Sequence, residues 1–98
     1  MHSPGRILLV EDDRKLAGTL ARGLRAEGYT VDLANSVADA LERTQAREYD
    51  AVMLDVLLPG ADGHEVCRTL RERDRWVPVL MITALGEVAD RIRGLDSG

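Results

Sequence analysis

The residues best able to do chemistry in this sequence are acids that directly follow apolar runs. Glu11, Asp12 and Asp13 follow "ILLV", and Asp55 follows "AVML". A carboxylate at the end of an apolar strand is costly to desolvate unless another group pairs with it. Clustered carboxylates also repel one another, so each makes its neighbours harder to ionise. A divalent cation such as Mg²⁺ relieves both problems, because it binds carboxylate oxygens together with water and phosphate.

This set of oxygen side chains indicates phosphoryl transfer. A carboxylate can itself be a nucleophile and form an acyl phosphate, and a metal ion neutralises charge on the transferring group. On this interpretation Asp55 is the phosphate acceptor, Asp12 is a direct metal ligand and Glu11 acts through a water molecule. The hydroxyl of Thr83, which follows "VLMI", hydrogen-bonds the new phosphoryl group.

Four apolar runs predict the strands that position these groups. Residues 7–10, 51–54 and 79–82 are continuously apolar and suit strands covered on both faces, whereas residues 29–34 alternate and suit an edge strand. Helical stripes alternate with these runs, namely Leu16, Leu20 and Leu24; Val37, Leu41 and Thr44; Val66 and Leu70; and Val88, Ile92 and Leu95. The order βαβαβαβα predicts an α/β fold with a doubly wound parallel sheet. Ligands of such sheets bind beyond the carboxyl ends of the strands, where the acids lie.

A few residues mark the ends of these elements. Asp13 and Ser36 are expected to cap the first and second helices, and Gly28 is expected to stop the first helix. Trp76, which precedes the fourth strand, is expected to pack as a lid over the core.

Composition bounds the class of protein. The chain has 98 residues, of which 45% are hydrophobic and 31% charged, and this is typical of one folded domain spanning residues 1–98. The net charge of −4 argues against nucleic-acid binding by this segment itself. No apolar run approaches the length of a membrane span. One cysteine, Cys67, excludes an internal disulfide, so the simplest expectation is a reducing cytoplasmic location.

Three separate segments resemble a known family. "ILLVEDD", "VMLDVLLPGADG" and "VPVLMITA" are similar to the first, third and fourth strand motifs of response-regulator receiver domains of bacterial two-component signalling. "TALGEVADRIRGLDSG" is most similar to receivers of the OmpR/PhoB type. The resemblance implies a flavodoxin-like, CheY-like fold with strand order 2-1-3-4. It also implies transcription regulation through a winged-helix domain absent from this chain, which alone would contact DNA.

The resemblance further implies the chemistry of the site. Asp55 accepts a phosphoryl group from the phosphohistidine of a sensor histidine kinase. Glu11, Asp12, Asp55 and the backbone carbonyl of Leu57 hold Mg²⁺, for which Mn²⁺ can substitute.

Other positions complete the family comparison. Thr83 corresponds to the switch hydroxyl, and Ala84 to the small residue that leaves room for phosphate. In the family a fifth strand carrying a catalytic lysine and a fifth helix follow, and these carry much of the dimerisation surface. The sequence stops at Gly98. We therefore expect a receiver that is incomplete at its C-terminus, lacks the lysine and self-associates as a homodimer or otherwise.

Two other classes of function stay open. The first is a hydrolase with an aspartyl-phosphate intermediate. Such enzymes usually carry a second acid two residues after the nucleophile, and here that residue is Leu57, which cannot transfer a proton. We therefore expect a phosphoacceptor that assists its own phosphorylation and dephosphorylation, and not an enzyme. The second is a receiver-like scaffold that never turns over phosphate. Formation and lifetime of the acyl phosphate separate these classes.

Overall fold

The computed structural model describes residues 5–55, 58 and 63–82. In chain order the elements are β1 (Arg6–Val10), α1 (Arg14–Ala26), β2 (Thr30–Ala34), α2 (Val37–Ala46), β3 (Ala51–Asp55), α3 (Gly63–Glu72) and β4 (Val79–Ile82). The strands pair in parallel, in the order β2-β1-β3-β4. This confirms the predicted fold class and strand order. The fourth helical stripe, at Val88, Ile92 and Leu95, lies outside the described residues.

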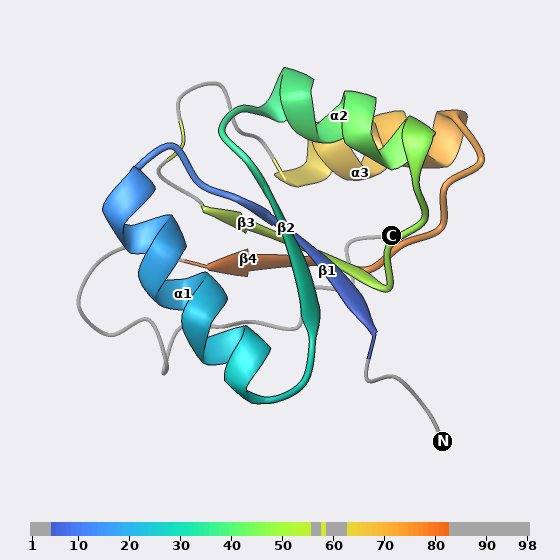
Figure 1. Cartoon of the computed structure of the whole chain (residues 1–98). Coiled ribbons are helices and arrows are strands. Elements are labelled where there is room, and N and C mark those ends of the chain that lie inside the picture. Colours follow the sequence, from blue (N-terminus) through green and yellow to red (C-terminus); the bar gives the residue numbers. More distant parts are fainter. Residues whose placement is uncertain (1–4, 56–57, 59–62, 83–98) are drawn as a thin grey trace.

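The sheet is the middle layer of the molecule, with α1 on one face and α2 and α3 on the other (Figure 1). Because neighbouring side chains of a strand point to opposite faces, each strand contributes to two apolar cores. Ile7 and Leu9 of β1 belong to the core beneath α1, and Leu8 and Val10 belong to the core beneath α2 and α3. Burial on both faces explains why the runs of β1, β3 and β4 are continuously apolar.

Helix α1 contacts the sheet through its small residues. Ala17 and Ala21 are only 4% and 1% exposed, whereas the leucines of the predicted stripe, such as Leu20 and Leu24, are half-buried and pack at the margin of the core. Side chains of this size let the helix axis approach the sheet closely, and the longer leucines cover the sides of the contact.

The predicted ends of the first two helices are confirmed. The carboxylate of Asp13 accepts a hydrogen bond of 3.0 Å from the backbone N–H of Leu16, and the hydroxyl of Ser36 accepts one of 3.1 Å from the N–H of Asp39. Gly28 follows α1 with a φ of 101°, a left-handed conformation that glycine adopts without strain. Among the helices within the described ranges, none has the length and apolar character that spanning a bilayer requires.

Strand β2 lies at the edge of the sheet, as its alternating pattern predicts, and a polar network covers one of its faces. Asp32 accepts a hydrogen bond of 2.7 Å from the hydroxyl of Tyr49 and one of 3.5 Å from Arg6, and Arg47 lies 3.9 Å away. Burial acts to raise the pKa of Asp32, but the Tyr49 hydrogen bond and the two arginines lower it overall. Burial and the contact with Asp32 raise the pKa of Tyr49 to about 12.

The prediction for Trp76 is wrong, because its side chain is 70% exposed. Its indole N–H donates a hydrogen bond of 3.2 Å to Asp74, and the guanidinium of Arg71 lies 4.9 Å from the ring centroid. The next residue, Val77, takes the buried position at 7% exposure. Trp76 therefore lies on the surface at the amino end of β4, away from the carboxyl ends of the strands.

Candidate functional site

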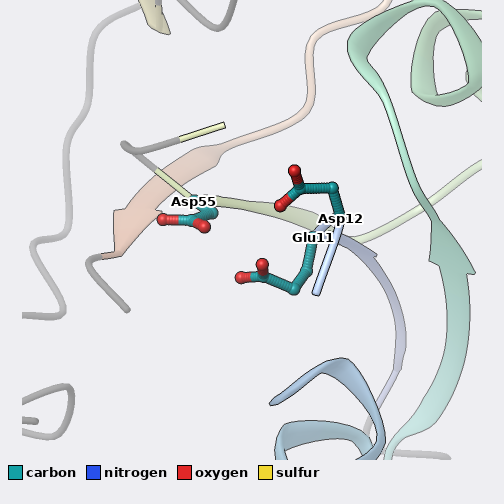
Figure 2. Close-up of side chains that lie close together, drawn as sticks. All are labelled: Glu11, Asp12 and Asp55. Carbon is teal, nitrogen blue, oxygen red and sulfur yellow. The ribbon is translucent and has the colours of Figure 1, made fainter. Parts of the chain in front are cut away.

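The strand order brings the predicted site residues together. β1 and β3 are neighbours, with Val10 paired to Leu54, so the acids that come next in sequence emerge at the same edge of the sheet. Carboxylate oxygens of Glu11, Asp12 and Asp55 all lie within 4.8 Å of one another. Figure 2 shows the three side chains side by side, two from the end of β1 and one from the end of β3.

The three acids differ in their exposure to solvent. Glu11 and Asp55 are 3% and 2% exposed, whereas Asp12 is exposed. One carboxylate oxygen of Glu11, Oε2, accepts a hydrogen bond of 3.0 Å from the N–H of Asp13. The other, Oε1, is buried and has no hydrogen-bond partner in the part of the chain that the structure describes. A buried oxygen of this kind is rare in folded proteins and indicates a missing partner.

Burial and charge combine to make Glu11 hard to ionise. Desolvation is the largest cause and raises its pKa, the hydrogen bond from Asp13 opposes this, and the interactions with Asp55 and Asp12 raise it further, to about 7. In the absence of a cation, the protonated form of Glu11 is therefore favoured to a higher pH than in a solvent-exposed glutamate. A cation held among the three carboxylates would reverse this balance by favouring the ionised form.

The donor set fits a hard divalent cation. Every candidate ligand atom in the cluster is a carboxylate oxygen, and Mg²⁺ and Ca²⁺ prefer oxygen ligands. The partnerless Oε1 of Glu11 would gain a partner, directly or through water, and the repulsion among the three acids would be offset. The exposed Asp12 leaves the site accessible from solvent, as a metal that keeps several waters needs.

Backbone contacts hold the two strand ends that carry the acids. The N–H of Glu11 donates a hydrogen bond of 2.9 Å to the carbonyl of Ala34, which ties the end of β1 to β2. The N–H of Leu58 donates one of 3.2 Å to the carbonyl of Asp55, and the Leu58 side chain is 4% exposed and belongs to the core beneath α2 and α3. These contacts define where the backbone at Glu11 and Asp55 leaves the sheet.

Three predicted site residues lie outside the described residues, namely Leu57, Thr83 and Ala84. Their roles, and the lysine expected from the family, stay predictions. The strand that leads to Thr83 does end beside Asp55, since Ile82 pairs with Asp55.

The sequence interpretation missed Arg14, which lines an open groove of about 630 Å³ together with Glu11 and Asp12. Arg14 and Lys15 open α1, and the first turn of this helix holds no acid. Cations at this end of a helix are disfavoured by the helix dipole. Two basic residues at such a position, directly after the acidic triplet, are the signal that could have pointed to a local electrostatic role.

Comparison with known proteins agrees with this geometry. A family model described as the response regulator receiver domain matches residues 7–98. The chain is 54% identical over 93 residues to the transcriptional regulatory protein TcrA of Mycobacterium tuberculosis, covering 95% of this chain and 37% of the relative. It is 46% identical over 93 residues to the response regulator MprA of Mycobacterium leprae, covering 95% and 41%. The chain thus spans about two fifths of the length of these relatives.

Two solved structures show the same likeness. The response regulator TrrA of Thermotoga maritima, solved in complex with Mg²⁺-BeF, superposes with a TM-score of 0.72 at 33% identity, covering 83% of this chain and 70% of that one. The receiver domain of the Francisella response regulator 1452 superposes with a TM-score of 0.75 at 28% identity, covering 96% and 78%.

Proposed function

The chain belongs to the response regulator receiver family of two-component systems, and from this premise we propose that Asp55 accepts a phosphoryl group in a reaction that depends on Mg²⁺. The observation that carries the proposal is the cluster of Glu11, Asp12 and Asp55, whose oxygens lie within 4.8 Å of one another. The Mg²⁺-BeF complex of the TrrA neighbour supports the choice of metal. Mn²⁺ is expected to substitute.

In the proposed reaction a carboxylate oxygen of Asp55 attacks the phosphorus atom of a phosphohistidine. A P–O bond forms and the P–N bond breaks, the electron pair passes to the imidazole nitrogen, and the histidine takes up a proton. Asp12 and Asp55 would bind the metal directly and Glu11 through water, and a metal held there would neutralise charge on the transferring group. Burial of Asp55 keeps bulk water away from its carboxylate, which favours attack by an oriented oxygen over a solvated one.

The product is an acyl phosphate on the protein itself, so we propose a phosphoacceptor and not an enzyme with a separate substrate. A hydrolase would need a proton donor near the leaving group, and the residue two positions after Asp55 is Leu57. The partner that supplies the phosphoryl group is proposed to be a sensor histidine kinase in the cytoplasm. The TcrA relative is a transcriptional regulatory protein, so we propose that the output is transcription, through a DNA-binding segment outside these 98 residues.

Intact mass spectrometry after incubation with acetyl phosphate tests the proposal. We expect the mass of one phosphoryl group to be added in the presence of Mg²⁺, and not in the presence of a chelator. Asp55→Asn should abolish the gain, because an amide is a poor nucleophile. Asp74→Asn is the matched control, since Asp74 is an exposed aspartate remote from the cluster. A mass gain that persists in Asp55→Asn, or no gain in a folded wild-type protein, would overturn the assignment.

A further inference from the structure

An open groove adjoins the acid cluster. Its volume is about 630 Å³, and Glu11 and Asp12 are among its lining residues. The other lining residues come from the start of α1, the end of β2 and the first two turns of α2. Because α1 and α2 lie on opposite faces of the sheet (Figure 1), the groove crosses the carboxyl end of the edge strand β2 between them. A molecule that fills the groove therefore also lies against the candidate phosphoryl site.

One large apolar side chain of this groove is exposed. Leu33 of β2 is 37% exposed, and two buried alanines, Ala17 of α1 and Ala34 of β2, line the groove with it. In the part of the chain that the structure describes, the other exposed large hydrophobic side chain is that of Trp76, at the opposite edge of the sheet. A single exposed leucine is ordinary on a protein surface. In a groove that also contains Asp12, however, it offers a bound partner an apolar contact beside the reacting groups.

Two arginines give the groove a second kind of contact. Arg14 lies on the α1 side and Arg43 on the α2 side. Within the described ranges of the chain, Arg14 makes no ion pair. Arg43 lies 3.3 Å from Asp39, in a pair whose side chains are 45% and 30% exposed. Exposed pairs of this kind are weak, so the guanidinium of Arg43 keeps donors for a carboxylate of a partner.

These two kinds of contact select the kind of partner. A free inorganic anion would use the arginines but not Leu33, and a purely apolar molecule would cover Leu33 but leave the arginines unmatched. A peptide segment can offer both contacts, because adjacent residues can carry an apolar and an acidic side chain. The proposed donor is a protein whose phosphohistidine must reach Asp55, so the residues next to that histidine must pass close to the groove.

We propose that the groove is a docking subsite for the phosphoryl donor, in which the segment beside the phosphohistidine covers Leu33 with an apolar side chain and pairs an acidic side chain with Arg43. This inference rests on the proposed function and names what holds the donor at that site. Acetyl phosphate is far too small to fill a groove of about 630 Å³. Leu33 and Arg43 therefore determine specificity for a peptide donor and not for a small one.

A comparison of two donors tests the inference. The probes are acetyl phosphate and a short synthetic peptide in which leucine and glutamate flank phosphohistidine, each measured as kcat/KM for phosphorylation in Mg²⁺. With the peptide, Leu33→Ser should lower kcat/KM about tenfold, because the apolar contact is lost. Arg43→Gln should lower it about fivefold, because a charge-assisted hydrogen bond is lost. With acetyl phosphate, both variants should react within about twofold of wild type.

Two further measurements isolate the contacts. The effect of Arg43→Gln should disappear with a peptide that carries glutamine in place of glutamate, because the pair is then already broken. In NMR titrations the unphosphorylated peptide should shift the methyl signals of Leu33 and not the indole signal of Trp76. The matched controls are Trp76→Ser, at the other exposed hydrophobic side chain, and Arg73→Gln, at an exposed arginine that does not line the groove. Both controls should react with both donors as the wild type does.

The outcomes separate the possible failures. If Leu33→Ser and Arg43→Gln slow both donors equally, they act on the fold or on the acids, and the inference is overturned. It is also overturned if neither variant slows the peptide, or if acetyl phosphate reacts while the peptide neither reacts nor shifts Leu33. If the wild-type protein is phosphorylated by neither donor, the proposed function itself has failed.

Discussion

Replacing Glu11 with glutamine should stabilise the metal-free protein above neutral pH. Glu11 is 3% exposed, and ionising it places a charge beside Asp55 and Asp12 without a cation to offset it. Glutamine has nearly the same shape, its amide oxygen can still accept the hydrogen bond from Asp13, and its amide N–H group can donate to Asp55. The substitution therefore removes a buried charge and keeps the main contacts.

The size of the effect follows from the pKa of Glu11, which rises from an ordinary 4.5 to about 7 in the folded protein. At about 1.36 kcal/mol per pKa unit, the difference corresponds to roughly 3 kcal/mol of lost stability when Glu11 is fully ionised. Because the amide must itself be desolvated, we expect glutamine to recover about 1–2 kcal/mol. In a domain of this size, that raises the melting temperature by roughly 5–15 °C.

The sign of the pH dependence provides a second check. A pKa raised by folding means that the stabilising protonated form is fully present below pH 4.5 and is lost as pH rises through about 7. The two proteins should therefore be similarly stable at pH 4, and the variant should gain its advantage between there and pH 8. Mg²⁺ at 100 times the wild-type Kd should then stabilise the wild type by about 2.7 kcal/mol and the variant by less, because the variant binds the ion more weakly, and this narrows the difference in stability between the two proteins.

Thermal and urea denaturation in a chelator and in Mg²⁺, at pH 4 and pH 8, would measure these differences. Glu42→Gln, at an exposed position of α2, is the control and should change stability by less than about 0.5 kcal/mol. The reasoning is refuted if Glu11→Gln is no more stable than wild type at pH 8 in chelator, or if its advantage is the same at pH 4.

Four further predictions follow from the site and the sheet. Asp12→Ala should lose most Mg²⁺ affinity and Glu11→Gln less, because a ligand that acts through water is easier to replace; an NMR titration with equal affinities in both variants contradicts this. Arg14→Ala should tighten Mg²⁺ binding and slow the reaction with anionic acetyl phosphate, since it removes a cation beside the groove; an Mg²⁺ affinity and a reaction rate that both rise or both fall would exclude this electrostatic role. Tyr49→Phe should cost about 1 kcal/mol at pH 8 and should remove the part of the stability loss that ionisation of Tyr49 is expected to cause between pH 10 and about 12, which denaturant titrations of both proteins at the two ends of that range can compare. In the part of the sheet that the structure describes, β4 is paired by β3 on one side, and we propose that its other edge pairs with a second copy of these 98 residues, because an apolar edge strand is a template for association; a monodisperse monomer in light scattering over a concentration series rejects this expectation.

Much of the fold could be predicted from the sequence, because burial on two faces leaves a strong pattern. The strands β1, β3 and β4 begin and end within one residue of their apolar runs, and β2 alternates because Asp32 and its partners occupy one face at the edge. The order of the strands in the sheet could not be predicted from this pattern. Periodicity identifies strands and not their neighbours, so the order 2-1-3-4 came from the resemblance to a family.

The candidate site was predictable to the extent that parallel strands bring their carboxyl ends to one edge. That rule joins Glu11, Asp12 and Asp55. The rule does not predict that Asp12 is exposed while Glu11 and Asp55 are buried, because exposure depends on how the chain turns after β1.

Features set by the approach of distant segments were not predictable. Trp76 was expected to pack as a lid over the core, but it lies at the surface beneath the guanidinium of Arg71, and Val77 fills the buried position instead. Likewise, how closely the side chain of Met81 on β4 approaches Gly63 at the start of α3 depends on the distance between these two elements. Sequence patterns record which faces are apolar, and not how closely two elements approach.

The crossover connectivity of the sheet has a consequence for the order of events in folding. β1 pairs with β2 on one side and with β3 on the other, and Ile7 is matched to Ala51 across two helices and a strand. During synthesis β1, α1 and β2 are complete first, and this unit carries Glu11 and Asp12 but not Asp55. Pairings between distant segments form slowly, since the loop must close before the contact stabilises it. The third carboxylate, that of Asp55, comes only with β3. Under the proposed function, metal binding that needs all three acids would therefore report the docking of β3, and a nascent chain or misfolded intermediate without that pairing would not be phosphorylated.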